Sequence, residues 1–184
     1  MYSAKRKVDE DGVYRSGIFS FGGIHDYRYE GPLIYVPLVP NSDSWTVPAT
    51  KISIGQVVIC QQDCNILFNT GIPYFYGPRE SVDQIHRALH EGAWRDRIGV
   101  YRLNCDREAH YLNLVVEFGG VEFQWKMGDL WKKRMEGARV VCISGIRDSA
   151  SPAGWTIGQR AMRKLFTVFD LKNTRMGVAT ASRP

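Results

Sequence analysis

The stretch Ile66-Leu67-Phe68-Asn69-Thr70-Gly71 carries the strongest indication of fold in this chain. Its three apolar residues are typical of the end of a β-strand, and the polar residues that follow end the apolar run. Asn and Gly both favour tight turns, so the Asn-Thr-Gly triplet alone is compatible with an ordinary turn. Its meaning therefore depends on the segments around it.

Length and composition indicate one β-rich domain. The chain has 184 residues, of which 44% are hydrophobic and 12% aromatic, with 18 glycines. This length suffices for a single domain with its own core. Turn residues recur about every ten residues, which is typical of an all-β sandwich or barrel-like body. No apolar run approaches the roughly 18 residues of a membrane span, and residues 1–12 lack the apolar centre of a signal peptide.

Short apolar runs rich in β-branched and aromatic residues predict the strands, and helical spacing predicts up to three short helices. Residues 1–16 are polar and are expected to form a lead-in. The expected strands are 18–21, 33–39, 52–59, 66–68, 100–103, 112–118, 121–125, 140–143 and 166–169, and the expected helices are 78–91, 127–135 and 159–163.

The four cysteines give information about disulfide bonds and about the cellular compartment of the protein. Cys60 and Cys64 are close enough for a small disulfide loop, which leaves Cys105 and Cys142 as the other pair. An even count favours two disulfides and an oxidising compartment, so a secretory, lumenal or extracellular location is expected. Zinc binding and buried free thiols are the alternatives, although no second close cysteine pair follows and no histidine stands at ligand spacing nearby.

The charge pattern gives weaker information about partners. The formal net charge is +5 and the pI is near 9.1. Basic clusters occupy residues 5–7, 132–134 and 160–164. Because they are far apart and two fall within apolar patterns, ordinary solvated surface is favoured over nucleic-acid binding. An acidic partner, a membrane surface or RNA is the alternative.

Several segments, in order, resemble the C-terminal lobe of the pepsin-like aspartic peptidases (peptidase A1). The resemblance extends over about residues 17–181. The segments that carry it are Phe21-Gly22-Gly23-Ile24, Cys60 and Cys64 ahead of Asn69-Thr70-Gly71, Gly77-Pro78, Asn104-Cys105-Asp106, Cys142-Ile143-Ser144-Gly145 and Trp155-Thr156-Ile157-Gly158.

This resemblance implies an all-β fold, a single pepsin-like lobe over residues 17–184 with one or two short helices. It also implies the disulfides Cys60–Cys64 and Cys105–Cys142. Family members have two lobes, each of which supplies one catalytic aspartate, and this chain resembles only the second lobe. The sequence contains no Asp-Thr-Gly or Asp-Ser-Gly.

The resemblance places Asn69 at the position of the catalytic aspartate, followed by Thr70 and Gly71. Aspartic proteases depend on two carboxylates that share one proton, and an amide cannot ionise. Where the family usually has two hydroxyl residues, one bonded to the carboxylate and one to the substrate backbone, this chain has Ile72 and Pro73, which have no hydroxyl.

Aromatic residues after this loop are candidates for a peptide groove. Tyr74, Phe75 and Tyr76 follow directly and are expected to line it with Ile72 and Pro73. Gln159 stands where the family usually has an aspartate, and no effect is assigned to it.

No metal or cofactor is expected. His86 and His90 share a face of the expected helix 78–91, but no third ligand is evident, so a solvated face is favoured over a metal site. His25 and His110 lie elsewhere in the sequence.

Three functions are compatible with these features. The first is a catalytically inactive, pepsin-like lobe that binds a peptide or protein or serves as a structural module. The second is one part of an active acidic endopeptidase whose N-terminal lobe is missing from this chain, because the chain is a fragment or one half of a two-chain enzyme. Asn69 is then either converted to Asp by deamidation or is an inactivating substitution. The third is an accessory subunit of a larger assembly, suggested only by the basic pI and residues 132–134. A lone lobe leaves one face uncovered, so a second lobe, another protein or self-association is expected.

Overall fold

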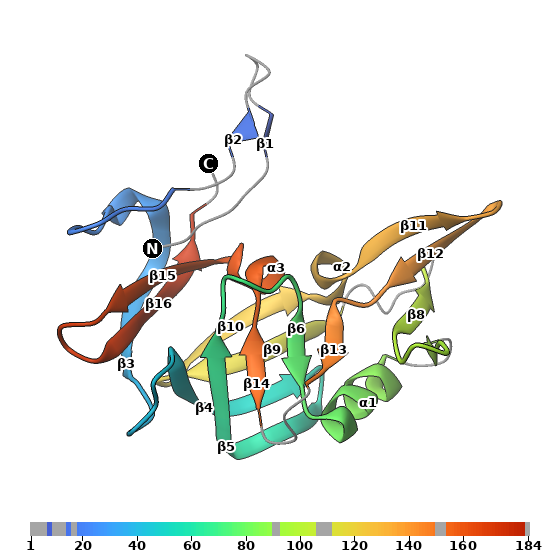
Figure 1. The fold of residues 1–184 in the computed structure, drawn as a ribbon, viewed down its shortest axis with the longest axis horizontal. Helices are drawn as coiled ribbons and strands as arrows, with labels where there is room; N and C mark the ends of the chain where they lie inside the picture. The colour runs from blue at the N-terminus through green and yellow to red at the C-terminus, as the bar shows by residue number, and fades with distance from the viewer. Residues whose placement is uncertain are drawn as a thin grey trace.

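The computed structural model describes residues 7–8, 14–15, 18–89, 93–105, 112–149 and 154–182. Most of these residues lie in β-strands (Figure 1), which confirms the all-β expectation. The elements are β1 (Lys7–Val8), β2 (Tyr14–Arg15), η1 (Asp26–Arg28), β3 (Tyr29–Pro37), β4 (Thr46–Ile54), β5 (Val57–Phe68), β6 (Phe75–Gly77), α1 (Arg79–Ala88), β7 (Trp94–Arg95), β8 (Tyr101–Asn104), β9 (Asn113–Phe118), β10 (Val121–Lys126), α2 (Met127–Leu130), β11 (Lys132–Glu136), β12 (Arg139–Ile143), β13 (Ile146–Asp148), β14 (Trp155–Ile157), α3 (Gln159–Met162), β15 (Leu165–Asp170) and β16 (Arg175–Ala181).

A curled seven-stranded sheet forms the centre, in the order β10-β9-β4-β5-β14-β6-β13. Its pairs are antiparallel except for β14 with β5 and β13 with β6, which are parallel. Buried and half-buried residues alternate along β9, where Leu114, Val116 and Phe118 face the core. Phe123 and Trp125 of β10 extend the same buried face. This period-two pattern is what a sheet with one covered face requires.

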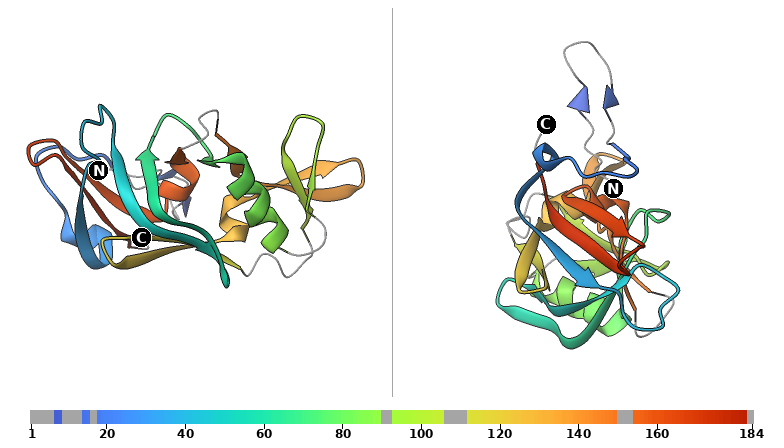
Figure 2. Two further views of the ribbon diagram at one scale, coloured as in Figure 1. Left: turned by 90° about the horizontal axis from the view of Figure 1, so that it is seen from below. Right: turned by 90° about the vertical axis from the view of Figure 1, so that its left-hand side faces the viewer.

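Two smaller sheets lie at opposite ends of the molecule. The three-stranded sheet β15-β16-β3 occupies one end, and the β11–β12 hairpin of the four-stranded sheet β11-β12-β8-β7 extends from the other (Figures 1 and 2). The β1–β2 pair projects away from both (Figure 1). It falls within the expected lead-in, and the boundary between lead-in and lobe stays a prediction.

The helices agree with the sequence in two places out of three. α1 lies beside β13 (Figure 1) and buries Val82 and Ile85, and Leu89 is buried directly after the helix, as the spacing predicts. Residues 90–91 of the expected helix lie outside the described part. α3 is also where it was expected. The expected helix 127–135 is wrong after Leu130, because residues 132–136 pair with β12 as β11. Cross-strand pairing here prevails over local helical propensity.

Two strand predictions also fail. The expected strand 52–59 is divided by a turn at Gly55, whose φ of +53° favours glycine, so that it becomes the end of β4 and the start of β5. The expected strand 18–21 has only an isolated bridge at Ile18, and Phe21 is 87% exposed. An apolar run forms a strand only where a neighbour pairs with it.

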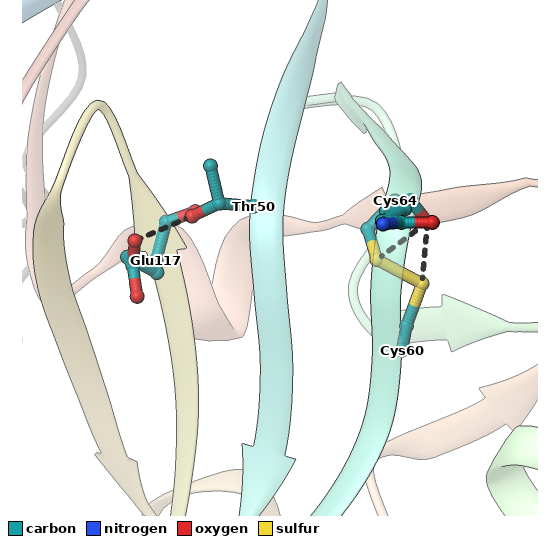
Figure 3. The surroundings of a disulfide bond; sticks show 5 residues. Thr50, Cys60, Cys64 and Glu117 are labelled. Atoms are coloured by element: carbon teal, nitrogen blue, oxygen red, sulfur yellow. Dashed lines mark hydrogen bonds between the residues drawn. A yellow bond between two sulfur atoms is a disulfide. The ribbon is translucent and has the colours of Figure 1, made fainter.

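Both disulfides are formed, so the zinc and free-thiol alternatives are wrong. Cys60 and Cys64 are joined within β5, beside the strand whose Thr50 donates a hydrogen bond to Glu117 (Figure 3). Cys105 and Cys142 are joined with their Cα atoms 5.2 Å apart, and both are buried. None of the helices in the described residues has the length and apolar character of a transmembrane span.

Candidate active-site loop

The candidate site is the loop of residues 69–74 between β5 and β6. β14 runs parallel to β5, with Ile157 opposite Phe68, so the two strands end side by side. The backbone N–H of Asn69 donates to the carbonyl oxygen of Ile157 at 3.0 Å. The first residue of the loop is therefore held at the carboxyl ends of two neighbouring parallel strands.

Asn69 is oriented by its own loop. The backbone N–H of Gly71 donates to Oδ1 of Asn69 at 2.8 Å. Because an N–H group can only donate, the atom facing it must be the amide oxygen. The Nδ2 group of this half-buried side chain then has no hydrogen-bond partner among the described residues. The loop thus presents an amide donor where a carboxylate would present an acceptor.

Gln159, for which the sequence predicts no role, holds the loop through hydrogen bonds. Its backbone N–H donates to the carbonyl of Ile72 at 2.8 Å, and its side-chain Nε2 donates to the carbonyl of Thr70, also at 2.8 Å. Arg160 adds a backbone donor to the carbonyl of Pro73 at 3.2 Å. Three donors from the first two residues of α3 therefore fix three carbonyl groups of the loop.

Gly158 lets α3 approach this closely. A Cβ at this position would lie 2.3 Å from the carbonyl oxygen of Tyr74 and 2.6 Å from that of Ile72. These are backbone atoms of the loop itself, so a side chain has no room. The glycine is required by this contact.

The other predicted groove residues do not all face the same way. Thr70 and Pro73 are exposed and Ile72, Tyr74 and Tyr76 are half-buried. Phe75 is fully buried, with its ring 5.7 Å from that of Trp155. The expectation that Phe75 lines a peptide groove is therefore wrong, because alternation along β6 directs it into the core.

His86 is buried, so the expectation of a solvated face is wrong. Its Nδ1 lies 2.7 Å from the carbonyl of Val82, one helical turn earlier, and its Nε2 lies 2.8 Å from Oγ of Ser144. The imidazole also stacks on the ring of Tyr101 at 3.8 Å. The carbonyl must accept, so Nδ1 carries the proton and Nε2 accepts from the serine.

Sequence pattern does not indicate this Ser144–His86 pair, because 58 residues separate the two. The pair has the atoms of a nucleophile and its base, yet both side chains are at most 2% exposed. No substrate reaches a group so enclosed, and the pair is structural. Among the described residues no three His, Cys, Asp or Glu side chains form a metal-binding group, and His90 lies outside them.

Burial lowers the pKa of His86 to about 4, an effect that outweighs the hydrogen bond to the Val82 carbonyl and the nearby Asp83 carboxylate. The unfolded chain binds the proton near pH 6.5, so stability contributed by neutral His86 is full above that pH and is lost as the pH falls toward 4. We expect a loss of about 3 kcal/mol over this window.

Urea unfolding at several pH values tests this expectation. His86→Gln keeps a donor and an acceptor but does not titrate, so its stability should vary less between pH 6.5 and 4 than that of the wild type. Parallel pH profiles for the two proteins would show that His86 does not contribute.

These features together define a β-rich lobe in which an Asn-Thr-Gly loop at the ends of two parallel strands is supported by a short helix. A model of the family "Eukaryotic aspartyl protease" matches residues 8–181. The chain therefore belongs to the eukaryotic aspartyl protease family, as the sequence predicts.

Individual relatives match in the same way. Pepsin A-5 of Mus musculus is 30% identical over 170 residues, which are 91% of this chain and 43% of that protein. Cathepsin D of Canis lupus familiaris is 27% identical over 91% of this chain and 41% of its own length. Pregnancy-associated glycoprotein 1 of Bos taurus is 32% identical over 89% of this chain and 42% of its own length. The chain thus spans less than half the length of these relatives.

Proposed function

We propose that this chain is a non-catalytic, pepsin-like lobe that binds a peptide or protein. The observation that carries the proposal is the Asn69 amide, whose oxygen accepts the Gly71 N–H and whose Nδ2 is directed elsewhere. The loop keeps an ordered, hydrogen-bonded geometry, while the group at the proposed acid–base position cannot take up a proton from water. The loop can therefore serve in binding while it lacks the acid–base group that catalysis requires.

The size of the catalytic loss follows from general acid–base chemistry. A positioned acid or base contributes typically about 10²–10⁴ in rate. Asn69 supplies neither, and Ile72 and Pro73 next to it add no hydroxyl group. Their carbonyl groups accept from Gln159 and Arg160, so these atoms already have partners.

An exposed apolar segment supports the presence of a protein partner. Phe19, Phe21 and Tyr27 are 61%, 87% and 68% exposed, and Ile18 and Ile24 add to the same stretch of chain. Apolar side chains gathered in this way are typical of a surface that another protein covers. A second lobe, another chain or a second copy of this chain would each bury it.

A second candidate is part of an active acidic endopeptidase, which the coverage of less than half of the relatives favours. It requires an N-terminal lobe from elsewhere and a carboxylate at position 69. Deamidation of Asn69 would supply the carboxylate and would raise the mass of its peptide by about 1 Da.

Cleavage of an unfolded protein substrate over about pH 3–7 tests the proposal. The natively purified, folded chain is expected to give no pepstatin-sensitive cleavage, because no carboxylate stands at position 69. Asn69→Asp, which restores the acid with nearly the same volume, is the matched variant and is also expected to be inactive alone, because the family's other carboxylate comes from a second lobe. Pepstatin-sensitive cleavage by wild-type protein with unmodified Asn69 would overturn the proposal, and a mass shift on that peptide would support the endopeptidase instead.

A further inference from the structure

A hollow of about 310 Å³ adjoins the candidate active-site loop. Tyr74 of the loop lines one side and Arg147 of β13 lies next to it. Arg102 of β8 and both Lys132 and Arg134 of β11 complete its basic lining. We refer to this hollow, bounded by these five residues and Asp96, as the basic hollow.

The basic hollow has an excess of positive charge. Its one lining carboxylate, Asp96, accepts from Nε of Arg102 at 2.8 Å, and Arg102 also pairs with Glu136. Lys132, Arg134 and Arg147 have no carboxylate within ion-pair distance in the part of the chain that the structure describes. Three cations therefore face one hollow without a counter-charge.

Arg147 adds an independent sign of a missing partner. Its guanidinium lies over the ring of Tyr74, with 4.7 Å from Cζ to the ring centroid, and its Nη1 is buried without a hydrogen-bond acceptor. A buried donor without an acceptor is unfavourable, because it has lost its hydrogen bonds to water and gained none in the protein. A carboxylate is the acceptor that arginine binds best, since it takes two parallel N–H donors.

We infer that the basic hollow binds an acidic segment of a peptide or protein, with aspartate or glutamate side chains on Lys132, Arg134 and Arg147. This inference rests on the proposed function, because it names the chemistry of the ligand beside the same loop. Ile98, which is 80% exposed, and Ile143 also line the hollow and offer contact to an apolar side chain next to the acidic ones.

A peptide fits this site better than a nucleic acid does. Single-stranded nucleic acids bind to basic grooves by stacking bases on free aromatic faces. Tyr74 is the one aromatic residue that lines the basic hollow, and the guanidinium groups of Arg147 and Arg160 already lie over its ring. The hollow therefore offers cations and aliphatic surface without a stacking platform.

Strand alternation supplies a matched pair of variants. Lys132 and Arg134 line the basic hollow, whereas Lys133 between them does not, and all three are exposed. Arg134→Glu and Lys133→Glu change the net charge equally, so they differ only in the face of β11 that is altered. Circular dichroism and urea unfolding check that both variants fold like the wild type.

The probe is a fluorescein-labelled peptide of glutamate and leucine, titrated with the full chain and followed by anisotropy. We expect Arg134→Glu to weaken binding about fivefold to tenfold, and Lys133→Glu to weaken it less than about twofold. Binding should also weaken with added salt. A peptide with lysine in place of glutamate should not bind.

Three results would overturn the inference: no binding of the acidic peptide, equal weakening by the two variants, or tighter Arg134-dependent binding of a single-stranded oligonucleotide. Mass spectrometry of the peptide after incubation keeps the inference separate from the proposed function. A peptide that stays intact and does not bind would rule out the basic hollow as a binding site, while the proposal of a non-catalytic lobe would still stand. Pepstatin-sensitive cleavage of a bound peptide would support the basic hollow as a binding site and would overturn the proposal that the lobe is non-catalytic.

Discussion

Replacing Gly158 by alanine is expected to destabilise the fold by at least about 4 kcal/mol, at the upper end for a single substitution. The added Cβ would stand 2.3 Å and 2.6 Å from the carbonyl oxygens of Tyr74 and Ile72. The Ile72 carbonyl cannot move away without losing the N–H of Gln159, which it accepts at 2.8 Å. The loop and α3 must therefore separate.

Urea unfolding of Gly158→Ala measures this effect, with Gly23→Ala as the matched control. A Cβ at Gly23 meets no atom within 4 Å, so the same substitution there should change the free energy of unfolding by less than about 0.5 kcal/mol. A Gly158→Ala protein within about 1 kcal/mol of the wild type would mean that the loop is not held against α3 as described.

The features that sequence predicted well are those that depend on local pattern or on several matching segments together. The apolar spacing of Val82, Ile85 and Leu89 needs no knowledge of the rest of the chain to indicate a helix. The two disulfides followed from the family resemblance and are both present. The Asn-Thr-Gly triplet alone indicates only a turn, and the matching segments around it identify it as the loop of the pepsin-like family.

The features that sequence missed depend on contacts between distant segments. Nothing near His86 indicates that Ser144 will accept or donate at its ring, and the two meet only because α1 packs beside β13. Gln159 differs from the residue usual in the family, and the sequence alone indicates no role for it. In the structure its Nε2 donates a hydrogen bond to the carbonyl of Thr70, 89 residues away. The basic residues at 132–134 indicated a helical surface, and only β12 pairing separates Lys133 from its two neighbours.

The loop shows that geometry and chemistry can be lost independently. Gly71, Gly158 and the carbonyl of Ile157 hold the backbone at Asn69 as firmly as an acidic residue would require. The contacts at Ile157 and Gly158 use backbone groups, and a carboxylate oxygen would accept the Gly71 N–H as the amide oxygen of Asn69 does, so the loop geometry does not depend on whether position 69 carries an amide or a carboxylate. Selection for binding or for folding alone would preserve them, which is why an ordered loop is not by itself a sign of activity.

Removing the Cys105–Cys142 disulfide is expected to destabilise the chain by about 4 kcal/mol in the chain-entropy description. The bond closes a loop over a sequence separation of 37, whereas Cys60–Cys64 closes one of only 4, for which the same description gives about 2 kcal/mol. Double substitution of each pair by alanine avoids placing hydroxyl groups at the buried positions of Cys64, Cys105 and Cys142. The long loop contains β9, β10 and β11, so its cross-link restricts much more of the unfolded chain.

Urea unfolding of the two double variants compares the pairs directly. The variant lacking Cys105 and Cys142 should be the less stable by about 2 kcal/mol, because the entropy term grows with the logarithm of loop length. It should also weaken acidic-peptide binding, since β12 carries Cys142 and pairs with the strand that lines the basic hollow. The short pair lies within β5, where Gln62 and Asp63 have φ of 73° and 51°. Strain at these two residues would make the short disulfide contribute less than about 2 kcal/mol and so widen the difference, whereas equal losses for the two pairs would contradict the dependence on loop length.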